Sequence, residues 1–315
     1  MDVSFGSNLL LGAGITLTTL NLDNITEWQK ALQMFENHSL IHRPEYLAAC
    51  EAGGLGRAEA WLLERDEHKL LLPVIREPFL LGKQDAVGFG GVLTLNADQQ
   101  FLSDAWSLLR SIWGNEQIQR ISIYLDPLHD ISSYGEGWHI HDDGPIHALE
   151  TDSVYDANFS DALIIDDLPP LGESIDLFFD LASRSYQIAN SPLMNDDYLN
   201  SLIWELGDEV RIFSIRRKHK ADAEQAVLVL KDGTKAYLVF AIPENRDTLT
   251  ELFVKHIAET LCAEGVSILL SGSAPPLLGD TGAAVIPPHS TLRKRTAIWN
   301  TQIAPELSTD NLKIA

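Results

Sequence analysis

Hydrophobic residues recur along the first half of the chain in two kinds of pattern. Alternation with a period of two is typical of a half-buried strand, and a spacing of three to four is typical of a half-buried helix. The patterns predict, in order, a strand at 15–20, a helix at 26–35, a helix at 44–51, strands at 58–64 and 69–76, a helix at 98–113 and a strand at 121–125. Pro44 suits the first turn of its helix, and Gly53-Gly54 would end that helix.

The second half of the chain repeats this order of elements. The patterns predict helices at 174–185 and 195–206, strands at 210–216, 224–230 and 235–242, a helix at 247–263 and a strand at 266–270. Between the halves, residues 129–170 are acidic and turn-rich, so we expect them to be irregular and to contain the domain boundary. The sequence therefore predicts two domains with similar element order, residues 1–150 and 151–315.

Composition adds limits to this picture. The chain has 315 residues, 45% of them hydrophobic, which is enough for two domains with separate cores. The formal net charge of −22 disfavours non-specific binding to nucleic acid or anionic membranes but leaves room for a local basic site. The two cysteines are far apart in sequence, and no run of about 18 apolar residues occurs. We therefore expect reduced thiols, no membrane-spanning segment and a cytoplasmic location.

The charges are distributed unevenly. Between Arg120 and Arg184 there is no Lys or Arg, whereas 14 Asp or Glu residues occur there. Cations gather instead at 211–220 and in the segment Pro287–Arg295, which follows the last predicted strand. This distribution suits a protein that admits an anionic ligand at one place only. The alternative explanations of the two basic clusters are a charged strand edge and a solvated turn.

Two other stretches suggest chemistry. The glycine-rich stretch Asp85–Leu93 is neither a phosphate-binding loop nor a dinucleotide fingerprint, so its glycines would let the backbone approach a ligand or a neighbouring strand. His139, His141 and His147 could ligate a metal, since alternate residues of a strand share one face. A solvated polar loop explains the histidines better, and we expect no metal site.

A series of short motifs, in order, resembles the FemABX aminoacyltransferases and their acyltransferase relatives, which are built from two tandem GNAT-type domains. The motifs that carry the resemblance are His42–Leu47, Leu71–Arg76, Asp85–Leu93, Leu125–Leu128, Ser183–Tyr186, Ala236–Ala241 and Leu292–Arg295. They span most of the chain. Asp126 departs from the family's pattern at the end of the first domain.

The resemblance implies an α/β protein with mixed sheets, two tandem GNAT-like domains and a cleft between them. It implies an acyltransferase that moves an aminoacyl group from aminoacyl-tRNA to an amine, without a metal or redox cofactor. Lys294 would supply positive charge where the oxyanion develops, with Arg293 or Arg295 as alternatives in the same segment. Arg184 would hold an anionic part of a substrate. The other expected substrate-binding positions are Tyr46, Arg76, Phe89, Gly90, Gly91, Tyr186 and Tyr237.

The chain also departs from the family in ways that narrow the acceptor. Where cell-wall-building members carry a lysine after the first helix motif, this chain has Leu47-Ala48-Ala49-Cys50. A UDP-linked cell-wall precursor is therefore not expected, and a small amine, an amino acid or a carrier-bound peptide fits better. Two alternatives stay open: an acyl-CoA-dependent N-acyltransferase of the same fold, and a non-catalytic GNAT pair that acts as a binding module.

Overall fold

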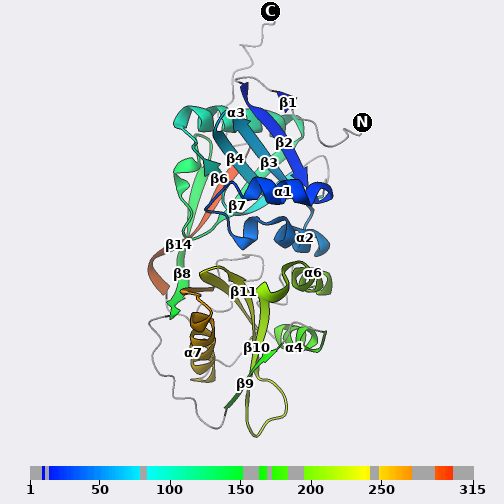
Figure 1. Ribbon diagram of the computed structural model, residues 1–315, viewed down its shortest axis with the longest axis vertical. Helices are drawn as coiled ribbons and strands as arrows, with labels where there is room; N and C mark the ends of the chain where they lie inside the picture. Colours follow the sequence, from blue (N-terminus) through cyan, green and yellow to red (C-terminus); the bar gives the residue numbers. More distant parts are fainter. Residues whose placement is uncertain are drawn as a thin grey trace, which may run out of the picture.

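The computed structural model describes residues 9–10, 14–78, 84–151, 163–168, 172–183, 195–241, 248–271 and 288–300. Within these ranges the side chains of residues 9–10, 145–147, 183, 240–241, 248 and 288–294 are not described. Figure 1 shows two halves stacked along the long axis, with helices on both faces of the strands. We call residues 1–150 the N-half and residues 151–287 the C-half.

The N-half follows the predicted order closely. Its elements are β1 (Leu9–Leu10), β2 (Thr16–Asn21), α1 (Ile25–Leu32), α2 (Pro44–Ala52), β3 (Arg57–Arg65), β4 (His68–Arg76), β5 (Gln84–Gly90), β6 (Leu93–Leu95), α3 (Gln99–Asn115), β7 (Ile118–Leu125) and β8 (His139–Glu150). Pro44 occupies the first turn of α2, as predicted. Asp98 caps α3, because its carboxylate accepts a hydrogen bond from the backbone N–H of Phe101 at 2.6 Å.

The C-half has the same order of elements. They are β9 (Leu163–Leu168), α4 (Gly172–Ser183), α6 (Asp196–Leu206), β10 (Val210–Arg217), β11 (Gln225–Asp232), β12 (Lys235–Ala241), α7 (Thr248–Ala263) and β13 (Ile268–Ser271). Asn195 caps α6 through a 2.8 Å bond from the N–H of Tyr198. After α7 the chain turns at Gly265, whose φ of +88° lies in the region that glycine adopts without strain.

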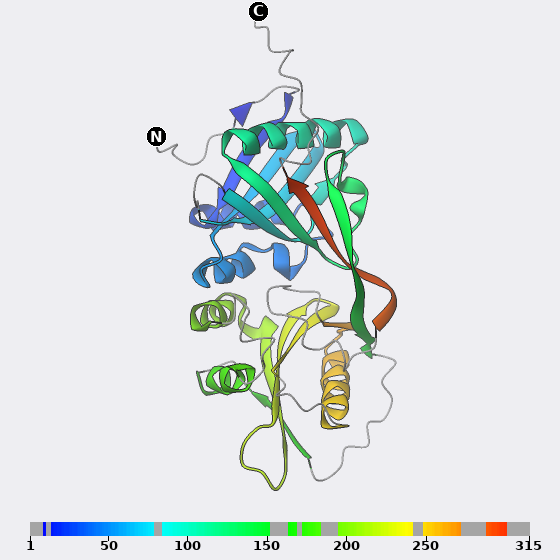
Figure 2. The same ribbon diagram turned by 180° about the vertical axis from the view of Figure 1, so that it is seen from behind.

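The final strand, β14 (Pro288–Asn300), belongs to the sheet of the N-half. It lies between β7 and β8, and the continuous strand order is β1-β2-β3-β4-β5-β7-β14-β8-β13-β12-β11-β10-β9. β8 pairs with β14 along its first part and with β13 along its last part, so these strands carry one sheet from half to half (Figure 2). Within the described chain each half has one parallel strand pair, β5 with β7 and β12 with β13.

Two expectations from the sequence are wrong here. Residues 129–170, predicted to be irregular, contain the strands β8 and β9. The basic segment Pro287–Arg295, expected to follow the last strand, contributes residues 288–295 to a further strand, β14. The partner of β14 on one side is β8, more than 100 residues earlier in the chain, and β8 is rich in His and Asp. Local alternation of apolar residues therefore could not reveal either strand.

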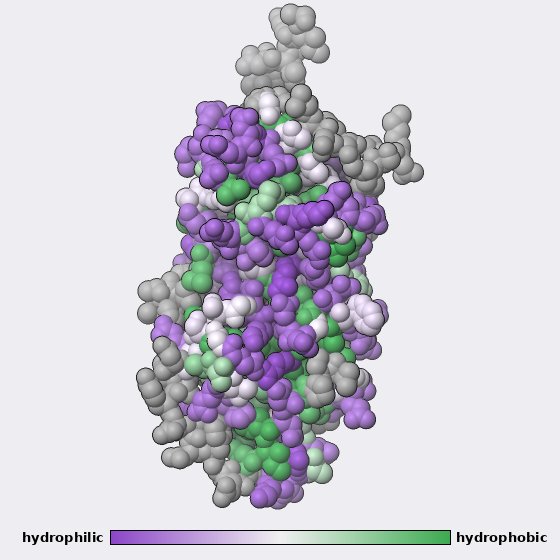
Figure 3. Space-filling view, viewed as in Figure 1, coloured by the Kyte–Doolittle hydropathy of each residue, from purple (hydrophilic) through white to green (hydrophobic). Residues whose placement is uncertain are grey.

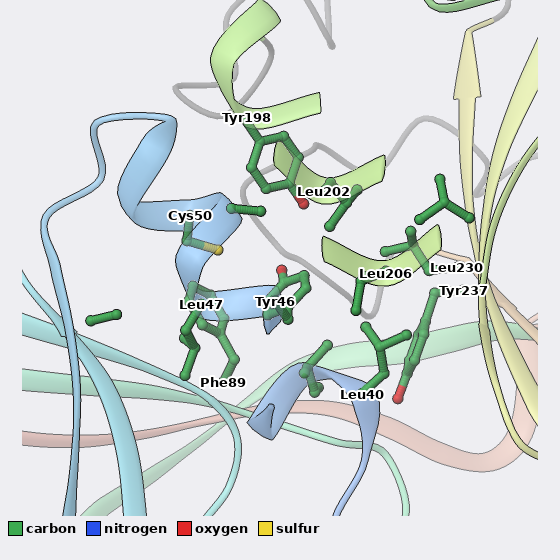
Figure 4. Packing of buried hydrophobic residues seen from close by; sticks show 14 of the residues in the cluster. Leu40, Tyr46, Leu47, Cys50, Phe89, Tyr198, Leu202, Leu206, Leu230 and Tyr237 are labelled. Carbon is green, nitrogen blue, oxygen red and sulfur yellow. The ribbon is translucent and has the colours of Figure 1, made fainter. Parts of the chain in front are cut away.

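The core does not stop at the boundary between the halves. One cluster of buried residues runs from α1 and α2 of the N-half to α4, α6, β10, β11 and β12 of the C-half. Figure 4 shows its centre, where Tyr46 and Cys50 of α2 face Tyr198 and Leu202 of α6. Two further clusters pack α3 and α7 against the opposite face of the sheet. The halves are therefore joined by apolar packing as well as by the sheet.

Candidate functional site

Each half presents one place where chemistry is expected, the carboxyl end of its parallel strand pair. In α/β proteins ligands bind at such ends, because the loops and helix N-termini that follow the strands gather there. In the N-half, β5 and β7 end at Gly90 and Leu125, which pair with each other. In the C-half, β12 and β13 pair from Lys235 with Ile268 to Leu238 with Ser271. The two ends differ in what occupies them.

The N-half end is covered by polar side chains from both halves, which we call the junction cluster. Its members are Ser39, His42, Asp126, His129, Lys235 and Tyr237. Asp126 follows β7 and is 6% exposed. Its Oδ2 accepts hydrogen bonds from Lys235 Nζ at 2.6 Å and from the Tyr237 hydroxyl at 2.8 Å, both on β12. One buried carboxylate of the N-half therefore holds the start of β12 in the C-half.

The charges of this contact are balanced inside the protein. Burial alone would raise the pKa of Asp126, but the ion pair with Lys235 and the hydrogen bonds outweigh it and leave this pKa below its usual value. Burial, with the nearby Asp126 carboxylate, raises the pKa of the Tyr237 phenol well above its usual value. At neutral pH Asp126 is therefore ionised, and Tyr237 is a neutral hydrogen-bond donor.

Two histidines complete the cluster in their neutral form. Burial lowers the pKa of His42 to about 3, and burial lowers that of His129 to about 4. His42 Nδ1 accepts the backbone N–H of Ser39 at 3.0 Å, so the proton of the neutral ring is on Nε2. Neutral imidazoles with such low pKa values are weak bases. They suit packing better than proton transfer.

The two imidazole rings lie directly on the glycine pair at the end of β5. A Cβ atom at Gly90 would come within 2.4 Å of the His42 ring, and one at Gly91 within 2.5 Å of the His129 ring. Both glycines also have a positive φ, +84° and +115°. Side chains thus fill the space where a ligand would approach this strand end. At the start of α3, the Asp98 carboxylate occupies the place where a helix N-terminus would bind an anion.

The carboxyl ends of β12 and β13 in the C-half have different surroundings. Strand β12 continues to Ala241, three residues beyond the last described pair with β13. Ala241 pairs with Ala226 on β11, Ala226 with Ser214 on β10, and Ser214 with Asp166 on β9, so these residues form one row across the sheet. A pocket of about 350 Å³ opens at the far end of this row, between β9, β10 and α4.

Several of the predicted site residues meet at the junction cluster. Gly90, Gly91 and Tyr237 belong to it or touch it, and Tyr46 and Phe89 lie just behind, with ring centroids 5.9 Å apart. Tyr46, Phe89 and Tyr237 are at most 1% exposed. These three aromatic residues are therefore core residues of the junction.

The predicted basic residues lie in different parts of the structure. Arg295 of β14 donates to the carbonyl of His129 at 3.0 Å, beside the junction cluster. Arg76 pairs with Ala86 near the other end of β5 and forms ion pairs with Glu59 and Glu116, so it does not join the cluster. The backbones of Arg293 and Lys294 pair with Pro145 and Gly144 of β8, while their side chains are outside the description. Arg184 and Tyr186 lie outside the described residues.

The sequence interpretation missed the polar residues that define the junction. The sequence places His42 and Asp126 within motifs and Lys235 at the start of a predicted strand, and it gives no functional signal for His129. A usable signal existed in the N-half, because Asp126 and His129 directly follow the predicted strand 121–125 and the parallel Gly90-Gly91 end lies beside it. No local signal pointed to Lys235, whose partner is 109 residues away.

The second basic cluster, residues 211–220, is largely neutralised. Arg211 forms ion pairs with Asp167 and Glu264, and both Arg217 and Lys220 form ion pairs with Glu224. Among the described residues no group of three His, Cys, Asp or Glu could hold a metal ion. None of the helices in the described ranges is long and apolar enough to cross a membrane.

No protein-family model matches the chain, and no curated protein matches it. Solved structures do. The chain is similar to a tandem GNAT protein from the clavulanic acid biosynthesis pathway, with a TM-score of 0.56 and 11% identity over 92% of this chain and 99% of that one. It is also similar to the C-terminal domain of a candidate lysylphosphatidylglycerol synthetase from Agrobacterium fabrum, with a TM-score of 0.52 and 11% identity over 89% and 92%.

A third similar structure is a conserved protein of unknown function from Bacteroides thetaiotaomicron, with a TM-score of 0.50 and 9% identity over 88% and 98% of the two chains. At such identities the likeness establishes the fold. It confirms the expected mixed α/β architecture of two tandem GNAT-like units. Membership of the FemABX group stays a prediction, because fold alone does not fix the reaction.

Proposed function

We propose that the protein is an N-acyltransferase that moves an acyl group from a thioester such as acyl-CoA to an amine, at the carboxyl ends of β12 and β13. The observation that supports this place most is the contrast between the two strand ends. The N-half end is filled by His42 and His129 against Gly90 and Gly91. The equivalent end of the C-half lies on a row that leads to a pocket. The similar tandem GNAT protein is described as being without AcCoA, a donor of the same class.

The reaction needs little from the protein. The amine nitrogen attacks the thioester carbonyl, a C–N bond forms and the C–S bond breaks. The proton lost by nitrogen ends on the departing sulfur, so the products are an amide and a free thiol. Negative charge develops on the carbonyl oxygen in between, and a fixed positive charge beside it stabilises the transition state. Holding the two reactants together supplies much of the remaining rate.

Lys294 is the residue we assign to this positive charge. It lies on β14, in the segment of three cations, next to a register shift between Lys294 and Arg295. Arg295 already donates to backbone carbonyls of the junction, which leaves Lys294 and Arg293 as the candidates of this segment. Arg184 and Tyr186 remain proposed contacts for an anionic part of a substrate.

A second candidate donor is aminoacyl-tRNA, with its acceptor stem as a partner. The observation in its favour is the likeness to the C-terminal domain of a candidate lysylphosphatidylglycerol synthetase. Against it, the cations Arg211, Arg217 and Lys220 are engaged by carboxylates, and the net charge of −22 opposes a polyanion. A thioester donor therefore fits the described surface better.

The test uses the purified full-length chain with acyl-CoA thioesters and a panel of amines, and measures thiol release and the mass of the product. We expect thiol release that survives RNase treatment and that falls about 10²–10³-fold in kcat in Lys294→Ala. Lys30→Ala, an exposed lysine on α1, is the matched control and should keep the wild-type rate.

Three other outcomes of this assay would each change the proposal. Activity with aminoacyl-tRNA alone, abolished by RNase, would select the second donor. An unchanged rate in Lys294→Ala would remove Lys294 from the mechanism while leaving the reaction in place. No product with any donor would favour the non-catalytic binding module.

A further inference from the structure

Ser271, the last residue of β13, carries a buried hydroxyl that the described residues leave unpaired. The residue is 2% exposed, and within the described chain its Oγ atom has no hydrogen-bond partner. Hydrophilic side chains cover much of the face in Figure 3, where water can bond them. Ser271 is shielded from water, and buried hydroxyls are nearly always bonded, because an unpaired one costs free energy. The hydroxyl therefore points to a ligand group that would bond it.

The surroundings of this hydroxyl are apolar. Alternate residues of a strand share one face of the sheet, so Ser271 lies on the same face as Leu269. Leu269 belongs to the cluster that packs α7 on that face, and so does Leu238 of β12, the register partner of Ser271. Aliphatic side chains cannot form hydrogen bonds with the hydroxyl. They do suit the hydrocarbon part of an acyl group, which gains free energy when it leaves water.

Ser271 also lies where the parallel strands of the C-half stop pairing. Leu238 and Ser271 are the last pair between β12 and β13 in the described chain, whereas β12 continues to Ala241. This is the strand end at which the acyl transfer is proposed above. Carboxyl ends of parallel strands are also the usual ligand sites of α/β proteins. The unpaired hydroxyl is thus placed at the proposed reaction centre.

The backbone of Lys294 lies beyond the same strand end. Strand β8 separates β13 from β14, and it pairs with Ser271 through His147 and with Lys294 through Gly144. Because β8 and β13 are antiparallel, Gly144 is three residues past the end of β13. Two strand spacings of about 4.8 Å and three residues of about 3.3 Å put the backbones of Ser271 and Lys294 on the order of 14 Å apart. That span fits a serine, a lysine and one carbonyl group between them.

We infer that the Ser271 hydroxyl donates a hydrogen bond to the carbonyl oxygen of the bound thioester. The inference deepens the acyltransferase function proposed above and rests on it for the identity of the ligand. A thioester carbonyl oxygen only accepts hydrogen bonds, so it matches a hydroxyl whose proton is unused. The bond strengthens when the amine attacks, because negative charge then develops on this oxygen. Ser271 keeps its proton while the C–N bond forms and the C–S bond breaks, and the proton of the amine ends on the departing sulfur.

The contact is tested without an amine, by calorimetry on the full chain with acetyl-CoA and with ethyl-CoA. Ethyl-CoA is a thioether of the same length, with CH₂ in place of the carbonyl group. We expect the wild type to bind acetyl-CoA about three- to tenfold more tightly, the contribution of one hydrogen bond. Ser271→Ala should bind the two ligands with nearly equal Kd values.

The matched control is Ser122→Ala. Ser122 is a buried strand serine of the N-half, and its hydroxyl accepts a hydrogen bond from Arg120 Nε at 3.0 Å. It lies on β7, away from the end of β13. This variant should keep the wild-type ratio of the two Kd values.

Stability and rate distinguish a ligand contact from a structural one. Removing an unpaired buried hydroxyl removes its desolvation cost, so without ligand Ser271→Ala should unfold at the urea midpoint of the wild type or at a higher one. In the acyl-transfer assay its kcat should fall about 10²-fold, because a donor to the developing charge is lost. A clearly lower midpoint would show that the hydroxyl is bonded within the protein, and the inference would be wrong.

The outcomes separate this inference from the proposed reaction. The same Kd ratio in Ser271→Ala and in the wild type would overturn the inference and leave the donor site in place. If neither ligand bound the wild type, the CoA donor of the proposed function would fail, and the inference with it. A ratio that falls to about one in Ser271→Ala but not in Ser122→Ala supports the contact, even if no amine gives a product.

Discussion

The two halves share one order of elements but use the carboxyl ends of their parallel strands differently. In the N-half, neutral imidazoles pack on Gly90 and Gly91, and Asp126 is committed to Lys235 and Tyr237. In the C-half, the corresponding row of the sheet leads to a pocket between β9, β10 and α4. One end forms part of the interface between the halves, and the other lies on a row that leads to an open pocket.

This difference shows how a duplicated architecture can divide its tasks. A strand end that binds a ligand must leave space and unsatisfied polar groups, which cost stability. A strand end that joins two domains should do the opposite, with filled space and balanced charges. The junction cluster meets the second description, apart from two imidazole Nε2 atoms that have no partner in the described residues. The predictions below test whether the N-half end is as closed as the structure shows.

The largest effect is expected from Gly90→Ala. The new Cβ would lie within 2.4 Å of the His42 ring and would force a residue with φ near +84° into strain. We expect a loss of about 3–5 kcal/mol in the free energy of unfolding, measured by urea denaturation. Gly54→Ala is the matched control, since Gly54 has a φ of +83° and nothing within 4 Å of its built Cβ.

The control should lose only about 1–2 kcal/mol, the strain of a positive φ without a contact. If Gly90→Ala cost no more than Gly54→Ala, the space beside Gly90 would be able to open. The N-half end would then be a usable pocket, and the contrast between the halves would fail.

A somewhat smaller loss is expected from Asp126→Ala. It removes the carboxylate that Lys235 and Tyr237 share, so a buried ammonium and a phenol lose their partner. Breaking a buried ion pair costs about 3–5 kcal/mol, and we expect the lower end. The reason is that Lys235 is 18% exposed and has Asp232 at 3.6 Å as a second carboxylate. A loss below about 1 kcal/mol, measured in the same urea assay, would show that the junction does not depend on this contact.

The sequence predicts some of these elements well and others poorly, because the signals it contains act over a few neighbouring residues. Helices α2 and α6 were placed nearly to the residue because Pro44 and Asn195 are start signals that act within one turn. Strand β14 was missed because its partners β7 and β8 come from the other half of the chain. Its residues were noticed for their charge instead.

The residues of the candidate site are likewise predictable only where the signal is local. The Gly90-Gly91 pair was recognised as a place of close approach, since only glycine permits it. Which group approaches could not be derived, because His42 is 48 positions earlier in the sequence and meets Gly90 only when the N-half folds. The pocket was not predicted for a similar reason. Asp166, Asp180 and Asp222 are unremarkable acidic residues until β9, β10 and α4 bring them together.

The pH dependence of stability tests the neutral histidines. The pKa values of His42 and His129 in the folded state, about 3 and about 4, lie below the ordinary value of 6.5. Between pH 4 and 6.5 the unfolded chain therefore binds protons that the folded chain does not, so stability is full above about pH 6.5 and falls as the pH drops. Each histidine should contribute about 1.4 kcal/mol per pH unit in this range.

The measurement is the urea midpoint at a series of pH values for the wild type and for His42→Gln. The slope between pH 4 and 6 should be smaller in the variant, whatever its absolute stability. His68→Gln, a histidine on β4 away from the junction, should keep the wild-type slope. Equal slopes in His42→Gln and the wild type would mean that His42 is protonated in the folded state, which the filled N-half end does not allow.

The smallest effect is expected from Glu209→Gln, and it shows why burial rather than position makes the junction strong. Arg43 Nη2 and Glu209 Oε1 also join the two halves, at 2.6 Å, but their side chains are 27% and 35% exposed. Solvent and salt screen such a pair, so its loss should cost less than about 1 kcal/mol and should disappear at high ionic strength. Asp126→Ala should keep its effect at high salt, because Asp126 is shielded from solvent. If both variants lost the same stability and responded equally to salt, the junction cluster would be an ordinary surface contact, and the N-half end would be no more closed than the pocket of the C-half.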